Sequence, residues 1–294
     1  MDKYCIIDDK IYFNDEFNEK LEPYINIISR FDKLIFCTFP FHETIHSITI
    51  NDFGDDGSKS FCEFNCSSKF NFDINYLPDC LDMIILSSKF NSYINLDNLT
   101  RLKYLIFGYE YNKQTKFVSM NNLTHLGFGY CFNFPLEIEY LKNLTHLKLS
   151  EKYNQAIKFP DNLIYLYIGY GFNIDINIPY SIKIIHTNSS NYSIIDYLPN
   201  TIEKIIIGVD FDVELNNLPN QIKKLQFEYT SDYSKKLVNL PDSIESIEIG
   251  YWTKFIEITN IPKNLKKIKC AKNCIIDSIY NIFDVKYEIE NYPD

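Results

Sequence analysis

The chain has 294 residues, and its 39 acidic and 29 basic side chains give it a formal net charge of -10. An acidic surface repels phosphate, so this balance argues against a nucleic-acid partner. Hydrophobic residues make up 46% of the chain, which is too many for a disordered protein. Alanine is nearly absent while isoleucine and aromatic residues are common, which favours strands over a helical bundle, although the codon bias of an AT-rich genome gives the same excess.

The first ten residues, MDKYCIIDDK, are charged where a signal peptide needs an apolar stretch, and no window is apolar enough for a membrane span. We therefore expect a soluble cytoplasmic protein, in the host cytoplasm if the chain is viral, that is not secreted and binds no membrane. The eight cysteines should be reduced thiols. Two pairs have C-x3-C spacing, Cys62 with Cys66 and Cys270 with Cys274, but zinc sites use tighter matched pairs, so we expect ordinary thiols.

Residues 1–75 are expected to form an N-terminal cap and irregular repeats. The stretch EFNEKLEPYINIISRF predicts a short amphipathic helix that Pro23 would break, with one apolar side made of Phe17, Leu21, Ile25 and Ile28. Strand-like rows with uneven spacing then begin at Phe31, Ile45 and Phe61. The turn NDFGDDGSKS between the last two rows lacks the alternating ligands of a calcium loop.

A short pattern, apolar-x-x-apolar-x-apolar, then recurs ten times over residues 76–271, at steps of about 19 to 22 residues. We number positions within each row from its first apolar residue. The rows begin at Leu81, Leu102, Leu123, Leu144, Leu163, Ile182, Ile202, Ile222, Ile244 and Leu265. A proline stands three residues before seven of the rows, and a glycine follows five of them directly. Residues 272–294 should form a C-terminal cap and tail.

This regularity predicts a β-rich solenoid. Positions four and six alternate as in a strand with one buried face, and stacked rows bury a shared core that one row alone cannot form. We expect the proline to fix an extended approach to each strand and the glycine to supply a backbone turn that other residues avoid. No linker or change of composition divides the chain, so we predict a single repeat domain over residues 1–294.

The rows resemble the leucine-rich repeat superfamily, and specifically the FNIP-type repeats found in social amoebae and in giant DNA viruses that infect amoebae. The family unit reads roughly LP-x-S-L-x-x-L-x-L-G-x-x-F-N-x-P-L. The segment GYCFNFPLEIEYLKNLTHLKL keeps Phe132, Asn133, Pro135 and Leu136 in the signature positions, and after residue 200 only the LP half remains. The resemblance implies a right-handed superhelix with a parallel sheet on its concave face and mostly extended or irregular convex segments.

Positions three and five of each row should face outward on that concave sheet. The middle rows place aromatic rings and histidines there, and the last rows place lysines, so we predict a partner-binding surface made of Tyr104, His125, His146, Tyr165, Tyr167, His186, Lys204, Lys224 and Lys267. Tyrosines also recur at position eight, as exposed anchors for a protein partner would. The same columns also fit a purely structural role, since stacked rings stabilise neighbouring strands and lysines keep a sheet soluble.

We find no catalytic constellation, no metal site and no cofactor motif in the sequence. The leading hypothesis is therefore a monomeric, non-enzymatic scaffold that binds a protein partner through the concave face. Residues 1–30 show no F-box, so a role as substrate adaptor, which the resemblance implies, would need a ubiquitin ligase supplied in trans. A structural or virion-associated role is a further alternative. An enzyme on a parallel β-helix would need clustered acidic residues, and the concave strands offer few.

Overall fold

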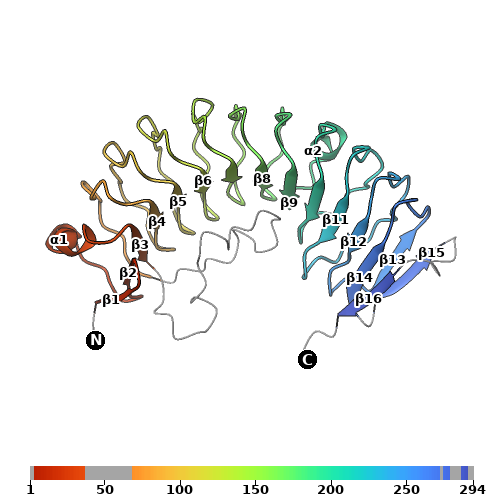
Figure 1. The fold of residues 1–294 in the computed structure, drawn as a ribbon, viewed down its shortest axis with the longest axis horizontal. Helices are drawn as coiled ribbons and strands as arrows, with labels where there is room; N and C mark the ends of the chain where they lie inside the picture. Colours follow the sequence, from red (N-terminus) through yellow and green to blue (C-terminus); the bar gives the residue numbers. More distant parts are fainter. Residues whose placement is uncertain (1–2, 37–67, 272–273, 279–285, 291–294) are drawn as a thin grey trace. The chain divides into compact units, whose positions relative to one another are not determined.

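The computed structural model describes residues 3–36, 68–271, 274–278 and 286–290, and these fall into two compact units that divide between Leu163 and Ile164. Figure 1 shows the strands of each unit side by side, with the longer connecting segments on the other side of the sheet. The rows expected at Ile45 and Phe61, the turn between them, and Cys62 with Cys66 lie outside the described residues. That the two units act as one domain stays a prediction.

Unit 1 is a ladder of short strands that pair in parallel after a single antiparallel hairpin. Its strands follow one another in the sheet in chain order. Its elements are β1 (Tyr4–Ile7), β2 (Lys10–Phe13), η1 (Glu22–Tyr24), α1 (Ile25–Ile28), β3 (Lys33–Phe36), β4 (Met83–Ile85), β5 (Tyr104–Ile106), β6 (His125–Gly127) and β7 (His146–Lys148).

The N-terminal cap differs from the expectation in two ways. The hairpin β1–β2 was not predicted; Asp8 turns it with a φ of 53°, and β2 then pairs in parallel with β3 as a first rung. Of the predicted helix only Glu22–Ile28 forms: Phe17 and Leu21 lie before it, and Pro23 stands in its first turn, where a proline fits. Helices η1 and α1 bury Ile28 against the end of the core.

Unit 2 continues the same pattern in a second parallel ladder, in the order β8, β9, β10, β11, β12, β14 and β16. A separate two-stranded parallel sheet pairs β13 with β15, with Phe255 opposite Ile275. The elements are β8 (Tyr165–Ile168), β9 (Ile184–Thr187), α2 (Ser193–Asp196), β10 (Lys204–Ile207), β11 (Lys224–Phe227), β12 (Ser246–Glu248), β13 (Phe255–Ile258), β14 (Lys267–Ala271), β15 (Ile275–Ser278) and β16 (Lys286–Glu290).

All ten regular rows form a strand that begins at position three, which confirms the predicted β-rich solenoid with its parallel sheet. Positions one and four are buried in every row, because they point into the shared core; in the first row these are Leu81 and Ile84. Each strand is entered through a tight turn in which the position-one N–H donates to the carbonyl three residues earlier. Ile222 donates to Pro219 in this way at 3.2 Å, so the proline is the first residue of the turn, and its effect on the approach to the strand stays a prediction.

The glycines after the strands serve close packing and not an unusual backbone angle. No φ in the left-handed region occurs at Gly108, Gly129, Gly208 or Gly250, which corrects the predicted reason for glycine. Instead, a Cβ on Gly108 would lie 1.8 Å from the carbonyl oxygen of Ser87, in the turn below. At Gly108, Gly129 and Gly250 the backbones of successive turns approach too closely for a side chain, whereas at Gly208 the nearest group is the Asn188 side chain.

The Phe-Asn pair of each repeat forms two ladders in unit 1. The asparagine side-chain oxygen accepts the backbone N–H of the equivalent residue one turn later, from Asn18 to Asn154. The donor–acceptor distances between successive rungs are 2.8 to 3.1 Å for Asn71, Asn91, Asn112, Asn133 and Asn154 as donors. The ladder satisfies backbone groups of the outer turns, which would otherwise remain without a regular partner.

The aromatic residue of each pair stacks in the core beside this ladder. Parallel rings with centroids 5.8 to 6.1 Å apart run through Phe70, Phe90, Tyr111, Phe132 and Tyr153. The pairs Tyr111–Asn112 and Tyr153–Asn154 were missed in the sequence because tyrosine replaces phenylalanine. In unit 2 the pattern continues with Asp212, whose Oδ1 accepts the Ser234 N–H at 2.9 Å, so the pair is modified after residue 200 and not lost.

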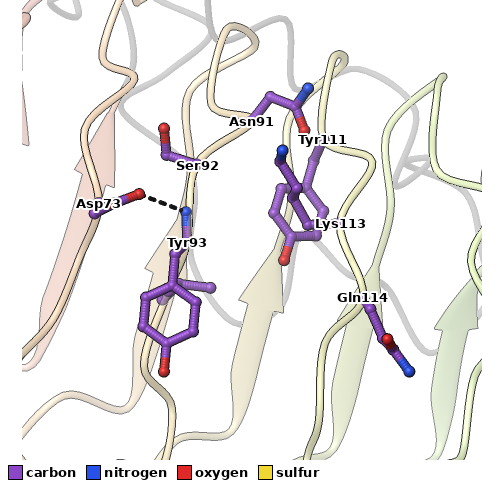
Figure 2. Close-up of a pocket in the computed structure, with 8 residues that line it drawn as sticks. Asp73, Asn91, Ser92, Tyr93, Tyr111, Lys113 and Gln114 are labelled. Carbon is purple, nitrogen blue, oxygen red and sulfur yellow. Dashed lines mark hydrogen bonds between the residues drawn. The ribbon is translucent and has the colours of Figure 1, made fainter.

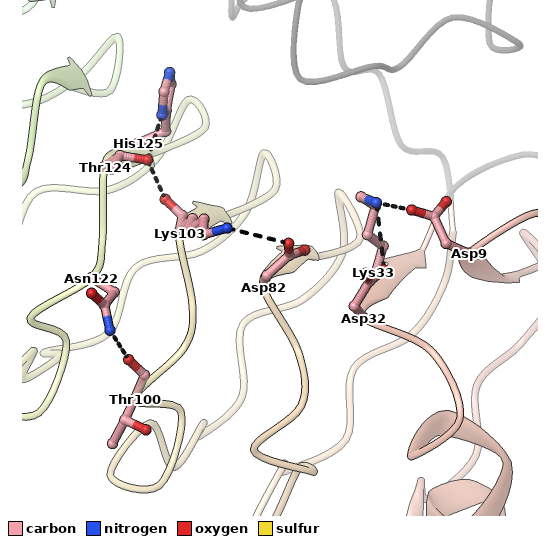
Figure 3. Close-up of polar contacts among 9 residues, drawn as sticks. All are labelled: Asp9, Asp32, Lys33, Asp82, Thr100, Lys103, Asn122, Thr124 and His125. Atoms are coloured by element: carbon pink, nitrogen blue, oxygen red, sulfur yellow. Dashed lines mark hydrogen bonds and ion pairs between the residues drawn. The ribbon is translucent and has the colours of Figure 1, made fainter.

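The recurring Asn-Leu-Thr triplets have a structural role in the turns. The Asn122 side chain donates to the Thr100 carbonyl and that of Asn143 to the Asn121 carbonyl, each at 2.7 Å. Figure 3 shows the first of these bonds between neighbouring turns. The amide of the triplet therefore joins one turn to the next.

Candidate interaction surface

The outer face of the sheet in unit 1 carries a column of stacked rings at position three. Tyr104 lies on His125 with ring centroids 4.4 Å apart, and His125 lies on His146 at 4.2 Å. The predicted register of the two histidines in adjacent rows is thereby confirmed. Each ring covers a face of its neighbour, and this is one reason why side chains at an outward position can be largely buried.

Hydrogen bonds fix which nitrogen of these imidazoles carries the proton. The Thr124 hydroxyl donates to the Lys103 carbonyl at 3.0 Å, so its oxygen accepts from His125 Nδ1, 2.9 Å away. Figure 3 shows this chain of bonds. Burial, and next the nearby His146, lower the pKa of His125 to about 3. His125 is therefore neutral at physiological pH, with its proton on Nδ1.

The depressed pKa of His125 predicts a loss of stability in mild acid. Unfolding returns the imidazole to an ordinary pKa near 6.5. Below that pH the unfolded chain therefore binds a proton at this residue, and the folded chain does not. We expect the free energy of unfolding to fall as the pH drops from about 6.5 toward 3, and His125→Asn to flatten this slope by about one proton. Urea unfolding of both proteins between pH 7 and pH 5 measures the difference; equal slopes would contradict the prediction.

An ionic cluster occupies the N-terminal end of the same face. Figure 3 shows the ammonium of the buried Lys33 between the carboxylates of Asp9 and Asp32, with the latter oxygen 3.4 Å away. Burial, and next the charge of Asp32, raise the pKa of Asp82, which also lies 3.9 Å from Lys103 Nζ. The outer face of unit 1 thus carries an ionic cluster at one end and a column of stacked rings at the other.

On the outer face of unit 2, two glutamate side chains contact residues of other strands. His186 Nε2 lies 2.8 Å from Glu228 Oε1, and Lys224 Nζ lies 2.8 Å from Glu248 Oε1. His186 Nδ1 also lies 3.3 Å from the Tyr165 hydroxyl. Lys224, one of the lysines that the last rows place on this face, is therefore neutralised by a glutamate of the next strand.

The nine residues predicted to bind a partner all lie in the predicted columns, but most are not exposed. Six of them are less than 9% exposed, which contradicts the expectation of an open surface: Tyr104, His125, Tyr165, Tyr167, His186 and Lys204. The other three, His146, Lys224 and Lys267, are half-buried. Period-two alternation identified the face correctly but gave no measure of how far surrounding groups cover each side chain. That these residues contact a partner stays a prediction.

Exposed aromatic rings lie just beyond the carboxyl ends of the strands, at position eight. In unit 1, Tyr109 is 52% exposed and stacks on Tyr130 with centroids 4.7 Å apart. Lys152 extends the column, with its ammonium 5.0 Å from the Tyr130 ring centroid. We call Tyr109, Tyr130 and Lys152 the carboxyl-edge column of unit 1. Its geometry holds two large amphipathic rings rigid and in contact with solvent.

Unit 2 has a corresponding pair. Tyr229 is 46% exposed and stacks on Tyr251 with centroids 5.1 Å apart and ring planes 3° from parallel. The next residue, Trp252, is the only tryptophan of the chain and is 59% exposed. Rigid exposed tyrosine and tryptophan rings are the residue types that dominate binding energy at protein interfaces.

A polar hollow of about 330 Å³ lies among the outer turns of unit 1. Figure 2 shows Lys113 and Gln114 on one side of it and the ring of Tyr93 on another, with Asp73 accepting the Tyr93 N–H at 2.9 Å. The hollow adjoins the asparagine ladder through Asn91 and is separate from the carboxyl-edge column.

The described residues contain no group of three histidine, cysteine or acidic side chains that could hold a metal ion. In the same part of the chain, no helix is long and apolar enough to cross a membrane.

Comparison with known proteins gives a family match and a similar fold. A family model described as the FNIP repeat matches residues 211–251. The crystal structure of CroV588, described as a novel circular LRR protein, resembles the chain with a TM-score of 0.60 and 24% identity over 94% of this chain. This chain spans 45% of the length of CroV588. A search of curated proteins finds no match.

A leucine-rich repeat protein from Bacteroides ovatus gives a TM-score of 0.19 at 12% identity, over 86% of this chain and 82% of that one, which is too low to support a shared fold. The matched FNIP segment lies where the sequence keeps the Leu-Pro half of the unit and where Asp212 replaces the ladder asparagine. The match shows FNIP repeats at residues 211–251, and the parallel ladder of ten rows has a fold similar to that of a leucine-rich repeat protein.

Proposed function

We propose that this protein is a protein-interaction scaffold whose partner contacts the carboxyl-edge tyrosines and the outer face of the sheet beside them. The single observation that carries the proposal is a stacked pair of tyrosines, the exposed Tyr109 on the half-buried Tyr130, repeated in kind by Tyr229 on Tyr251. A repeat fold of this class generally serves binding and not catalysis. The half-buried His146, Lys224 and Lys267 would border the contact.

A capture experiment with paired variants tests the proposal. Tyr109→Ala with Tyr130→Ala should weaken partner capture from amoebal lysate by about tenfold to a hundredfold, as loss of two interface hot spots does. The matched control is Tyr76→Ala with Tyr93→Ala, which removes two tyrosines of the same unit that are 56% and 57% exposed but lie elsewhere. Equal capture by the two double variants, quantified by mass spectrometry, would refute the carboxyl-edge surface.

The same experiment separates the two alternatives that the sequence left open. A substrate adaptor acting with a ligase in trans would co-purify ligase subunits together with the partner. A structural or virion-associated protein would instead be recovered with virion components, and its capture would not depend on Tyr109 and Tyr130.

A further inference from the structure

Two cysteines lie at the turn that connects β14 of the main ladder of unit 2 with β15 of its small second sheet. Cys270 lies near the end of β14, and Cys274 comes directly before β15. The Cys274 N–H donates to the Ala271 carbonyl at 3.0 Å, which closes a tight turn and returns Cys274 to the end of β14. The turn brings Cys274 back beside Ala271, the neighbour of Cys270 in the chain, and the two thiols are in hydrogen-bond contact.

The two thiols differ in access. Cys270 is 2% exposed, and Cys274 is half-buried. The thiol of Cys274 is hydrogen-bonded to that of Cys270, and this contact together with burial raises the pKa of Cys274 above its ordinary value. Cys80, by contrast, directs its thiol to the backbone carbonyl of Phe31 at 3.3 Å. The pair at the turn therefore combines the half-buried Cys274 with the buried Cys270, whose thiol contacts it.

We propose that Cys270 and Cys274 form a redox modification site, a dithiol that a hydroperoxide converts into a reversible disulfide. The accessible Cys274 reacts first, and the buried Cys270 resolves the product. The proposal goes beyond partner binding, because it needs neither the carboxyl-edge column nor the outer face of the sheet.

The chemistry balances with the hydroperoxide as the sole oxidant. The thiolate of Cys274 attacks the peroxide oxygen, the O–O bond breaks, and an alcohol, or water from hydrogen peroxide, leaves with the proton. The resulting sulfenic acid is attacked by the sulfur of Cys270, the S–O bond breaks, and water leaves as the disulfide forms. The two thiols lose two electrons and two protons, and a dithiol reductant restores them by thiol–disulfide exchange.

The disulfide would tie β14 of the main ladder to Cys274, the residue directly before β15. In the described part of unit 2, β15 pairs with β13 alone. Two-stranded sheets are marginal by themselves, so a covalent link at this turn would restrain an end of the solenoid that otherwise depends on few contacts.

Peptide mapping of the full-length protein tests the site. Lys272 lies between the cysteines in the sequence, so trypsin separates Cys270 from Cys274 unless a disulfide holds the two peptides together. After treatment with hydrogen peroxide and alkylation of the remaining thiols, we expect the linked pair, 2 Da lighter than the sum of its reduced peptides and absent after dithiothreitol. Because the thiolate is the reacting form, its yield at early times should rise with pH, by up to about tenfold per unit below the pKa.

Two variants make the order of events testable. Cys270→Ser should leave the sulfenic acid of Cys274 unresolved and trapped by dimedone, and Cys274→Ser should give no adduct at the buried Cys270. Wild-type protein that yields no linked pair while the half-buried Cys131 is oxidised would overturn the proposal. A dimedone adduct at Cys270 of Cys274→Ser, equal to that at Cys274 in the other variant, would overturn the assigned order.

Discussion

Gly129→Ala is expected to destabilise unit 1 more than its single added methyl group suggests. A Cβ at this position would lie 2.1 Å from the carbonyl oxygen of Gly108 and 2.7 Å from the Cα of Tyr109, and both are backbone atoms of the previous turn. Backbone cannot rotate away as a side chain can, so the turns must separate. We expect a loss of about 3 kcal/mol, the upper part of the usual cost of overpacking.

Calorimetric unfolding measures this loss. For a unit of this size, about 3 kcal/mol corresponds to a fall in melting temperature of roughly 6 to 12 °C. Ser119→Ala changes a partly exposed position in the same turn and serves as the control. It should change the free energy of unfolding by less than about 0.5 kcal/mol. A melting temperature of Gly129→Ala equal to that of the control would show that successive turns do not approach closely here.

The second large effect concerns the stacked rings of the core. Phe132 is fully buried, with its ring centroid 4.0 Å from that of Phe128 and 6.1 Å from those of Tyr111 and Tyr153. Phe132→Ala would leave a cavity in the middle of the stack and remove contacts with three rings. We expect it to lower the free energy of unfolding by about 3 to 5 kcal/mol, as for other buried phenylalanines.

Chemical denaturation of a short series checks the stacking explanation. Phe132→Leu keeps much of the volume but not the ring, so it should cost distinctly less than Phe132→Ala. Phe134→Ala is the matched control, because this phenylalanine lies two residues further along and is 36% exposed. A loss at Phe134 as large as that at Phe132 would contradict the assignment of the stack to the core.

The repeated strands could be predicted from the sequence because one pattern recurs ten times. Each row shows the alternation of a half-buried strand, and the spacing fixes which residues share a column. Strands β1 and β13 were missed because they belong to no regular row. Short apolar runs such as Tyr4–Ile7 do not by themselves distinguish a strand from a buried helix segment.

The candidate surface was predicted only in part, for a physical reason. Alternation assigns Tyr167 and His186 to the outer face, yet each is 1% exposed, since their rings contact each other with centroids 4.7 Å apart. Exposure depends on packing between neighbours, which a one-dimensional pattern does not contain. The tyrosines at position eight were noticed in the sequence, but the stacking that makes Tyr109 and Tyr130 a rigid pair required the structure.

Two local sequence patterns were explained incorrectly or not at all from the sequence. Glycine after a strand was attributed to a special turn, whereas Gly108 and Gly250 admit the backbone of the preceding turn. The Phe-Asn signature carried no mechanism in the sequence. In the structure the two residues have different roles. The ring of Phe132 fills the core, and the Asn133 side-chain oxygen accepts a backbone N–H of the next turn.

Hydrogen–deuterium exchange of the protein with and without its captured partner tests the central claim most directly. If the partner binds the carboxyl-edge column of unit 1, we expect it to slow exchange in the backbone that carries this column. That backbone is Tyr109–Glu110, Tyr130–Cys131 and Glu151–Lys152. Exchange in the outer turns around Tyr76 and Tyr93 should not change. Protection confined to those outer turns, with none at the carboxyl edge, would contradict the account and place the binding surface on the opposite side of the solenoid.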